Sequence, residues 1–306
     1  EHVAPSLGVR AAEFFREQAT RNHLSTIVVP TMRAKKALLG RGIPEEKIAR
    51  IAPGVNAVEA YPLPDHKRDR YRMLMGIAHD APLVVSVCPL EDAAIGELIA
   101  AMQEIVSRIP SAKLFIFGDG AARESALKKV ADAGLAESVI LIGAMTSILS
   151  KIFSSADVSI HTCAGGSSYA LVAEAQACAT PVVAYRTGCL DELILDGETG
   201  VLVERGDRAK LADNVVTLLK NRELRKKIGA NARTFILEHH EVTNSAEEYV
   251  KLWQSAAPEA DWMTTTGSIS HEELKEIKDE ALSGLRTPLP VKRGIDGGRN
   301  SGGEKL

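Results

Sequence analysis

Residues 156–184 read ADVSIHTCAGGSSYALVAEAQACATPVVA, and no other stretch says more about the architecture. The β-forming residues at 157–160 predict a strand, and the glycines and hydroxyls at 164–168 predict a turn after it. The helix formers at 169–179 then predict a helix, and residues 181–184 predict a second strand. A strand that turns through glycines into a helix directs free backbone N–H groups and the positive helix end at one point. A phosphate group is the expected occupant of that point.

The same alternation continues along most of the chain. Runs of four or five apolar residues are separated by amphipathic helices, which is typical of a parallel sheet covered on both faces. The sequence therefore predicts an α/β fold, a doubly wound parallel sheet over about residues 53–240. Strands are expected at 25–29, 48–51, 83–87, 113–117, 139–142, 157–160 and 181–184, and helices at 32–40, 68–75, 95–109, 121–133, 147–154, 169–179, 207–219, 224–237 and 245–253.

Composition narrows the class of protein. A chain of 306 residues with 45% hydrophobic and 25% charged residues can bury one large core or two modest ones. A net charge of −3 and only 4% aromatic residues give no reason to expect a nucleic-acid partner. The four cysteines show no metal-ligand spacing, so we expect core thiols in a reducing compartment and no metal site. No apolar run reaches the roughly 20 residues that span a bilayer and no signal peptide is recognised, which favours a cytoplasmic location.

Three motifs, one within residues 156–184 and two upstream, point to a resemblance to a known family. Glu174 precedes AQACATPVVA, while GIPEEKI at 42–48 and IAPGVN at 51–56 lie upstream. The chain resembles, over about residues 24–254, the retaining, nucleotide-sugar-dependent glycosyltransferases of family 4, which have the GT-B architecture. That family shows two glutamates separated by seven residues, a GxPVVA strand, and an upstream GxPxxKI…PNGVD run.

The resemblance implies a domain organisation and a reaction. Residues 1–52 would end an N-terminal acceptor-side domain that is mostly absent, 53–240 would bind the donor, 241–257 would form a closing helix, and 258–306 a flexible polar tail. The donor would be a nucleotide-diphosphate sugar, and its sugar would pass with retention to an unknown saccharide, lipid or small-molecule acceptor. No metal or other cofactor is implied, and the catalytic residues stay unknown.

Donor-binding residues are expected along this register. Glu174 would hydrogen-bond a ribose hydroxyl, as an acidic residue does in other dinucleotide folds, or would simply face solvent. The glycines after residue 117 would lie beside the donor, or would only serve a tight turn. The full expected set is Gly118, Gly120, Gly143 near the base, Gly166, Ser167, Ser168, Tyr169, Ala170 and Glu174. His161 is expected to be a satisfied core histidine.

The sequence departs from the family pattern at three positions. Gly166 occupies the place of the first glutamate, and Pro89 and Ala94 occupy those of an arginine and a lysine that clamp the diphosphate. Losing two cations removes stabilisation of the negative charge that develops on the leaving group. Arg123 and Arg186 are the nearest candidate replacements. Two hypotheses follow: an active glycosyltransferase, or a catalytically degenerate, non-enzymatic relative that binds nucleotide or protein.

Three surface features complete the predictions. The basic run HKRDRYR at 66–72 is either a solvated connector or a peripheral contact with an anionic membrane. Asp191 and Glu192 are expected to begin a surface helix. A capping pattern of Ser270 and Glu273 predicts a short helix in the tail.

Overall fold

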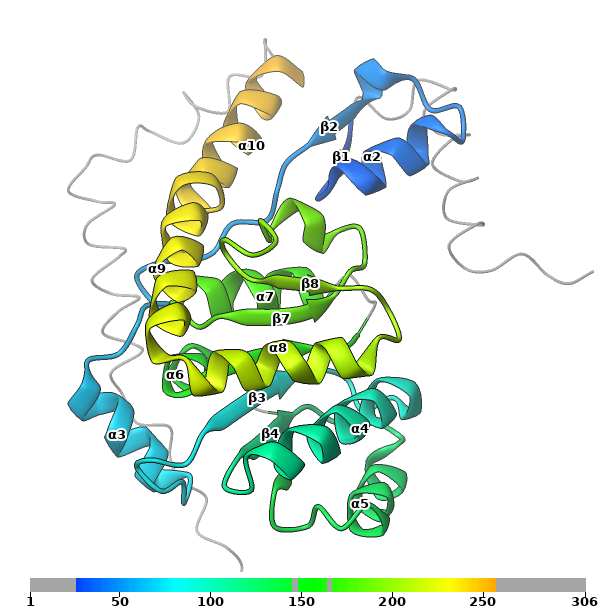
Figure 1. The fold of residues 1–306 in the computed structure, drawn as a ribbon. Coiled ribbons are helices and arrows are strands. Elements are labelled where there is room, and N and C mark those ends of the chain that lie inside the picture. Colours follow the sequence, from blue (N-terminus) through cyan, green and yellow to red (C-terminus); the bar gives the residue numbers. More distant parts are fainter. Residues whose placement is uncertain (1–25, 145–147, 164–166, 257–306) are drawn as a thin grey trace, which may run out of the picture. The chain divides into compact units, whose positions relative to one another are not determined.

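The computed structural model describes residues 26–144, 148–163 and 167–256 (Figure 1). The predicted tail and its short helix lie outside the described residues, as does Gly166. Two parallel sheets form within the described part, one of two strands and one of six. The prediction of an α/β fold built on a parallel sheet is therefore confirmed.

The six-stranded sheet has the strand order β5-β4-β3-β6-β7-β8, and all of its pairs are parallel. The chain moves outward from β3 to β4 and β5, then returns to the other side of β3 with β6. Its strands are β3 (Leu83–Val87), β4 (Lys113–Phe117), β5 (Val139–Gly143), β6 (Val158–His161), β7 (Val182–Tyr185) and β8 (Val201–Val203). The direction of winding thus reverses between β3 and β6, which is where open α/β sheets bind their ligands.

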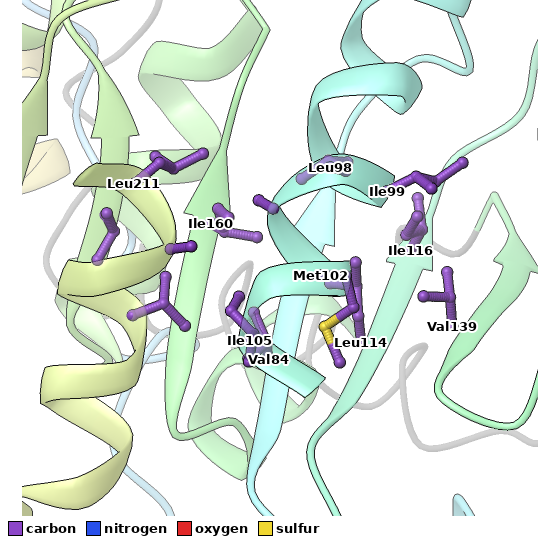
Figure 2. Packing of buried hydrophobic residues seen from close by; sticks show 14 of the residues in the cluster. Val84, Leu98, Ile99, Met102, Ile105, Leu114, Ile116, Val139, Ile160 and Leu211 are labelled. Carbon is purple, nitrogen blue, oxygen red and sulfur yellow. The ribbon is translucent and has the colours of Figure 1, made fainter. Parts of the chain in front are cut away.

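Alternate strand residues enter two separate cores because successive side chains point to opposite faces of a sheet. On one face, α4 (Asp92–Arg108), α5 (Arg123–Asp132) and α8 (Arg208–Lys220) cover the strands. Figure 2 shows residues of this core from the strands, α4 and α8: Val84, Leu98, Ile99, Met102, Ile105, Leu114, Ile116, Val139, Ile160 and Leu211. On the other face lie α6 (Leu149–Ser155), α7 (Ser167–Ala177) and part of α9 (Arg222–His239).

The small sheet pairs β1 (Ile27–Val29) with β2 (Ile48–Arg50), and α2 (Met32–Leu39) connects them. The chain then runs to α3 (Asp65–Leu74) and on to β3. Val55 on this connection bridges to Glu241, just before α10 (Val242–Ala256). The connection is therefore held against the end of α9 by backbone hydrogen bonds, Val55 N–H to His240 at 2.8 Å and Val242 N–H to Val55 at 3.1 Å.

The basic run at 66–72 is partly buried, and two of its arginines bind a carboxylate of the large sheet. It forms most of α3, and its Arg72 is only 2% exposed. Arg68 and Arg72 both donate to the buried carboxylate of Asp157, at 2.9 and 3.4 Å. Two of its cations thus hold α3 to the start of β6, which corrects the reading of the whole run as a solvated connector.

Among the described residues, no helix is both long and apolar enough to cross a membrane.

Candidate functional site

The candidate site lies at the carboxyl ends of the strands that flank the reversal of winding. β3 is followed by Cys88 and β6 by Thr162 and Cys163, and α7 begins at Ser167. The first N–H groups of a helix have no partner within the helix and carry its positive end. The amino end of α7 is thus a place at which the fold can bind an anion.

Two side chains in the first turn of α7, those of Ser168 and Tyr169, make contacts inside the protein. Ser168 is 3% exposed, and its hydroxyl donates to the carbonyl of Cys163 at 3.2 Å. The hydroxyl of Tyr169 contacts Nδ1 of His240 at 3.4 Å. Ser167 opens the helix and Ala170 is exposed on it. An anion here would therefore meet backbone N–H groups, whereas the one hydroxyl proton of Ser168 is already used.

The predicted glycines have structural reasons to be glycine. A Cβ on Gly118 would lie 1.8 Å from the carbonyl oxygen of Cys88, and one on Gly120 would lie 2.7 Å from that of Leu90. Gly143 ends β5 at a φ of 104°, and its carbonyl accepts the N–H of Gly118 at 3.0 Å. Close packing against the loop after β3 explains Gly118 and Gly120 without a ligand, and the positive φ explains Gly143, where an added Cβ would meet nothing within 4 Å.

Glu174 lines a cavity of about 370 Å³ between α6, α7 and the connection before α3. Asn56, Glu59, Ser150 and Ala170 line the same cavity. The Glu174 side chain is half-buried, and burial raises the pKa of its carboxyl, with the nearby charge of Glu59 adding to the effect. Within the part of the chain that the structure describes, nothing hydrogen-bonds this carboxylate. A half-buried acceptor without a donor is suited to a ligand that carries hydroxyl or amine groups.

Lys151 supplies a positive charge at the edge of this cavity. Its charge partly offsets the raised pKa of Glu174. The ammonium group lies 4.6 Å from the centre of the Tyr61 ring and donates to the carbonyl of Glu59 at 3.4 Å. Sequence reasoning found Glu174 but missed Lys151 and Glu59, which no motif marks. The Asn-containing turn at 53–56 was the available signal for this wall of the cavity.

The two candidate replacement cations are engaged elsewhere. The Arg186 guanidinium forms ion pairs with three carboxylates, those of Asp191, Asp196 and Glu204. Arg123 donates to the carbonyl of Leu141 at 3.3 Å. The charge of Arg186 is therefore already matched by carboxylates, whereas Arg123 makes one hydrogen bond to a neutral carbonyl and keeps other N–H donors.

Ala94 and Pro89, at the expected clamp positions, also have defined places. Ala94 is 7% exposed, and its carbonyl accepts the hydroxyl of Thr162 at 3.1 Å. Pro89 is exposed in the loop that follows β3. The first turn of α4 is thus joined to the residue after β6 through neutral groups.

Two other polar residues near the sheet have structural partners. His161 on β6 is 3% exposed and lies 2.9 Å from the hydroxyl of Ser159, and burial lowers its pKa to about 4. This agrees with a neutral core histidine. Glu192 lies in a short 3₁₀ turn, Leu190–Glu192, and binds the amino end of α2. The helix expected at Asp191 and Glu192 is present as this short 3₁₀ turn and Asp191 is exposed, but the surface position was wrong for Glu192, because its side chain is only 16% exposed.

Comparison with known proteins identifies relatives over most of the described part. The sequence matches the family model described as "Glycosyl transferases group 1" over residues 68–235. It is 27% identical over 157 residues to the N-acetyl-alpha-D-glucosaminyl L-malate synthase of Bacillus anthracis, covering 51% of this chain and 41% of that protein. It is 32% identical over 205 residues to the GDP-mannose-dependent alpha-(1-6)-phosphatidylinositol monomannoside mannosyltransferase of Mycolicibacterium smegmatis. This match covers 64% of this chain and 53% of that protein. The chain thus spans about half the length of these curated relatives.

Solved structures share the fold. HepE of Anabaena, in complex with UDP and glucose, superimposes with a TM-score of 0.72 at 19% identity, covering 80% of this chain and 67% of that one. At this level of identity the likeness concerns the arrangement of helices and strands.

Proposed function

The chain belongs to the glycosyl transferases group 1 family, and on that premise we propose that it binds the nucleotide-diphosphate sugar of a retaining, family 4-like glycosyltransferase. Residues 53–240 form the donor-binding domain in this proposal, and residues 1–52 end the acceptor-side domain. The acceptor is a saccharide, lipid or small molecule.

The observation that carries the proposal is the carboxylate of Glu174. It is half-buried, lines a cavity of about 370 Å³ and has no hydrogen-bond donor among the described residues. The cis hydroxyls of a ribose supply the donors that this carboxylate lacks. A charged acceptor that gains such hydrogen bonds contributes about 1.5–3 kcal/mol to binding.

The diphosphate then lies at the amino end of α7. Glu174 is seven residues after Ser167, the first residue of that helix, so the two sites are about 10 Å apart at 1.5 Å per residue. A nucleoside diphosphate can span this separation. The N–H groups of Tyr169 and Ala170 would bind phosphate oxygens, and the helix dipole would stabilise the charge that the leaving diphosphate gains.

Transfer by the complete gene product tests this function. That protein is incubated with a panel of nucleotide sugars, and release of the nucleoside diphosphate is measured for the wild type and for Glu174→Gln. We expect turnover with at least one donor and a loss of roughly tenfold or more in kcat/KM for the variant. Nucleotide binding without turnover would instead support the catalytically degenerate relative. Turnover that is equal in both proteins would exclude Glu174 from the donor site.

A further inference from the structure

A short turn before α3 forms a second polar wall of the cavity that Glu174 lines. Asn56 and Glu59, both exposed, belong to this turn and line the same cavity. The carbonyl of Asn56 accepts the backbone N–H of Glu59 at 3.1 Å and that of Ala60 at 2.9 Å. Residues three apart in such a helical turn lie on one face of it. The side chains of Asn56 and Glu59 can therefore act together on a single ligand.

The turn is held in place from several sides. Its first residue caps it, because the side-chain oxygen of Asn56 accepts the backbone N–H of Val58 at 3.0 Å. Three consecutive carbonyls accept donors from α6 and α9: that of Glu59 from Lys151 at 3.4 Å, that of Ala60 from Arg233 at 3.1 Å and that of Tyr61 from Ser154 at 2.6 Å. A wall that is fixed before the ligand arrives loses little conformational entropy on binding.

The two side chains of this wall present a defined pattern of donors and acceptors. The side-chain oxygen of Asn56 is used within the turn, so its NH₂ group is the part left to donate. An ionised Glu59 carboxylate can only accept. Within the described ranges, neither that NH₂ group nor that carboxylate has a hydrogen-bond partner. The wall therefore offers one donor group followed by two acceptor oxygens.

Guanine is the standard base whose hydrogen-bonding edge complements this pattern. Its Watson–Crick edge carries the O6 acceptor and then two adjacent donors, N1–H and the 2-amino group. Adenine and cytosine place a ring-nitrogen acceptor at the centre of that edge, and uracil has a carbonyl on either side of its one N–H. A carboxylate repels such acceptors, so it selects against these three bases as well as for guanine.

We propose that Asn56 and Glu59 select guanine, so that the donor substrate of this chain is a guanosine diphosphate sugar. This choice of base rests on the proposed function, in which Glu174 binds the ribose of the same nucleotide. The Glu59 carboxylate accepts N1–H and the 2-amino group, and the Asn56 NH₂ donates to O6. The apolar residues that line the rest of the cavity contact the faces of the ring: Val55, Ala60, Leu149 and Ala170.

Two properties of the cavity support this assignment. Its volume of about 370 Å³ lies in the range of about 300–1,000 Å³ that is usual for pockets that bind small molecules. Burial raises the pKa of the Glu174 carboxyl, and the charge of Glu59 raises it further. The two carboxylates thus act on one space, as the two ends of a nucleoside require.

Calorimetric titration of the full chain with GDP, UDP and inosine diphosphate tests the choice of base. Inosine diphosphate keeps O6 and N1–H and lacks only the 2-amino group of guanine. We expect the wild type to bind GDP at least about tenfold more tightly than UDP, with inosine diphosphate between them. Glu59→Gln keeps the size of the side chain and the backbone contacts of the turn. It should reduce the preference for GDP over UDP to about threefold or less.

Two further variants separate recognition of the base from binding of the nucleotide. Glu174→Gln should weaken binding of GDP and UDP by similar factors and keep the preference between them, because it acts on the ribose. Glu124→Gln, on the exposed side of α5, should change neither affinity. A wild type that binds UDP as tightly as GDP, or an undiminished preference in Glu59→Gln, would overturn the assignment of guanine and leave the proposed function standing. Absence of binding to all three nucleotides would overturn the proposed function and this assignment with it.

Discussion

Glu192 accepts a hydrogen bond of 3.0 Å from the backbone N–H of Met32, although 160 positions separate the two residues. The other carboxylate oxygen of Glu192 accepts a hydrogen bond of 3.3 Å from the backbone N–H of Arg33. The hydroxyl oxygen of Thr31 accepts one of 3.1 Å from the backbone N–H of Ala34. The amino end of α2 is thus capped both by its own sequence and by a carboxylate from the loop after β7. This contact fastens the small sheet to the large one.

Removing that carboxylate should loosen α2. We expect Glu192→Ala to cost about 0.5–2 kcal/mol, the usual contribution of a helix cap, and to speed amide hydrogen exchange in residues 32–39 above all. Exchange measured by mass spectrometry checks this. Glu45→Ala is the matched control, because Glu45 pairs with Lys35 in the same small unit but its side chain is 71% exposed. Equal exchange of α2 in the two variants would contradict the capping role.

The buried aspartate that opens β6 should contribute far more to stability. Asp157 pairs with Arg68 at 2.9 Å, Arg72 at 3.4 Å and Arg225 at 3.3 Å, and also accepts the N–H of Leu83 at 2.9 Å. Asp157→Ala leaves these cations without a partner, so we expect a loss of about 3–5 kcal/mol in urea unfolding. Asp213→Ala removes the partner of Arg108 at an exposed site and should cost about 1 kcal/mol or less. Comparable losses for both variants would disprove a special role for the buried cluster.

Two glycines should respond in opposite ways to the same substitution. Gly118→Ala would place a Cβ 1.8 Å from the Cys88 carbonyl oxygen at a φ of 152°, so we expect a loss of about 2 kcal/mol or more. Gly96 lies within α4 with nothing within 4 Å of an added Cβ. Gly96→Ala should therefore stabilise the protein by about 0.5–1 kcal/mol. Thermal unfolding of both variants measures the contrast, and a neutral Gly118→Ala would show that the loops are not tightly packed.

The raised pKa of Glu174 predicts a pH-dependent stability difference. Burial disfavours the charged carboxylate in the folded state relative to the unfolded chain, so ionisation of Glu174 costs folding free energy. The stability of the neutral form is present at low pH and is lost as pH rises through the folded pKa. Glu174→Gln, which stays neutral, should therefore gain Tm over the wild type as pH rises from about 4 through the folded pKa of Glu174.

The control for this experiment is Glu124→Gln, which changes an exposed residue of α5. Its Tm difference from the wild type should stay constant over the same pH range. A constant difference for Glu174→Gln as well would show that its carboxylate is not desolvated.

The sequence predicted strands β3 and β4 with the observed bounds, because short apolar runs between helices leave few alternatives. It missed β8 (Val201–Val203), whose three residues carry no periodicity of their own. That strand exists because its backbone pairs with β7, aligning Val183 with Val201. Pairing between distant segments is information that local pattern does not contain.

In the candidate site, too, the sequence predicted what local pattern contains and missed what depends on contacts between distant segments. Glu174 could be found by its place in a motif, but its missing donor and its neighbour Glu59 depend on how the connection before α3 lies over α7. Arg72 reads as one cation of an exposed basic run, yet it is buried beside Asp157, 85 positions later. Charge composition could not separate the cations that face solvent from those that hold the fold together.

Calorimetric titration of this chain with UDP and GDP, for the wild type, Glu174→Gln and Glu124→Gln, measures whether Glu174 belongs to a nucleotide site. We expect the wild type to bind at least one nucleotide with a dissociation constant below the millimolar range. We also expect a roughly tenfold or greater loss of affinity in Glu174→Gln and none in Glu124→Gln. Absence of binding to either nucleotide at millimolar concentration, or equal affinity in wild type and Glu174→Gln, would contradict it.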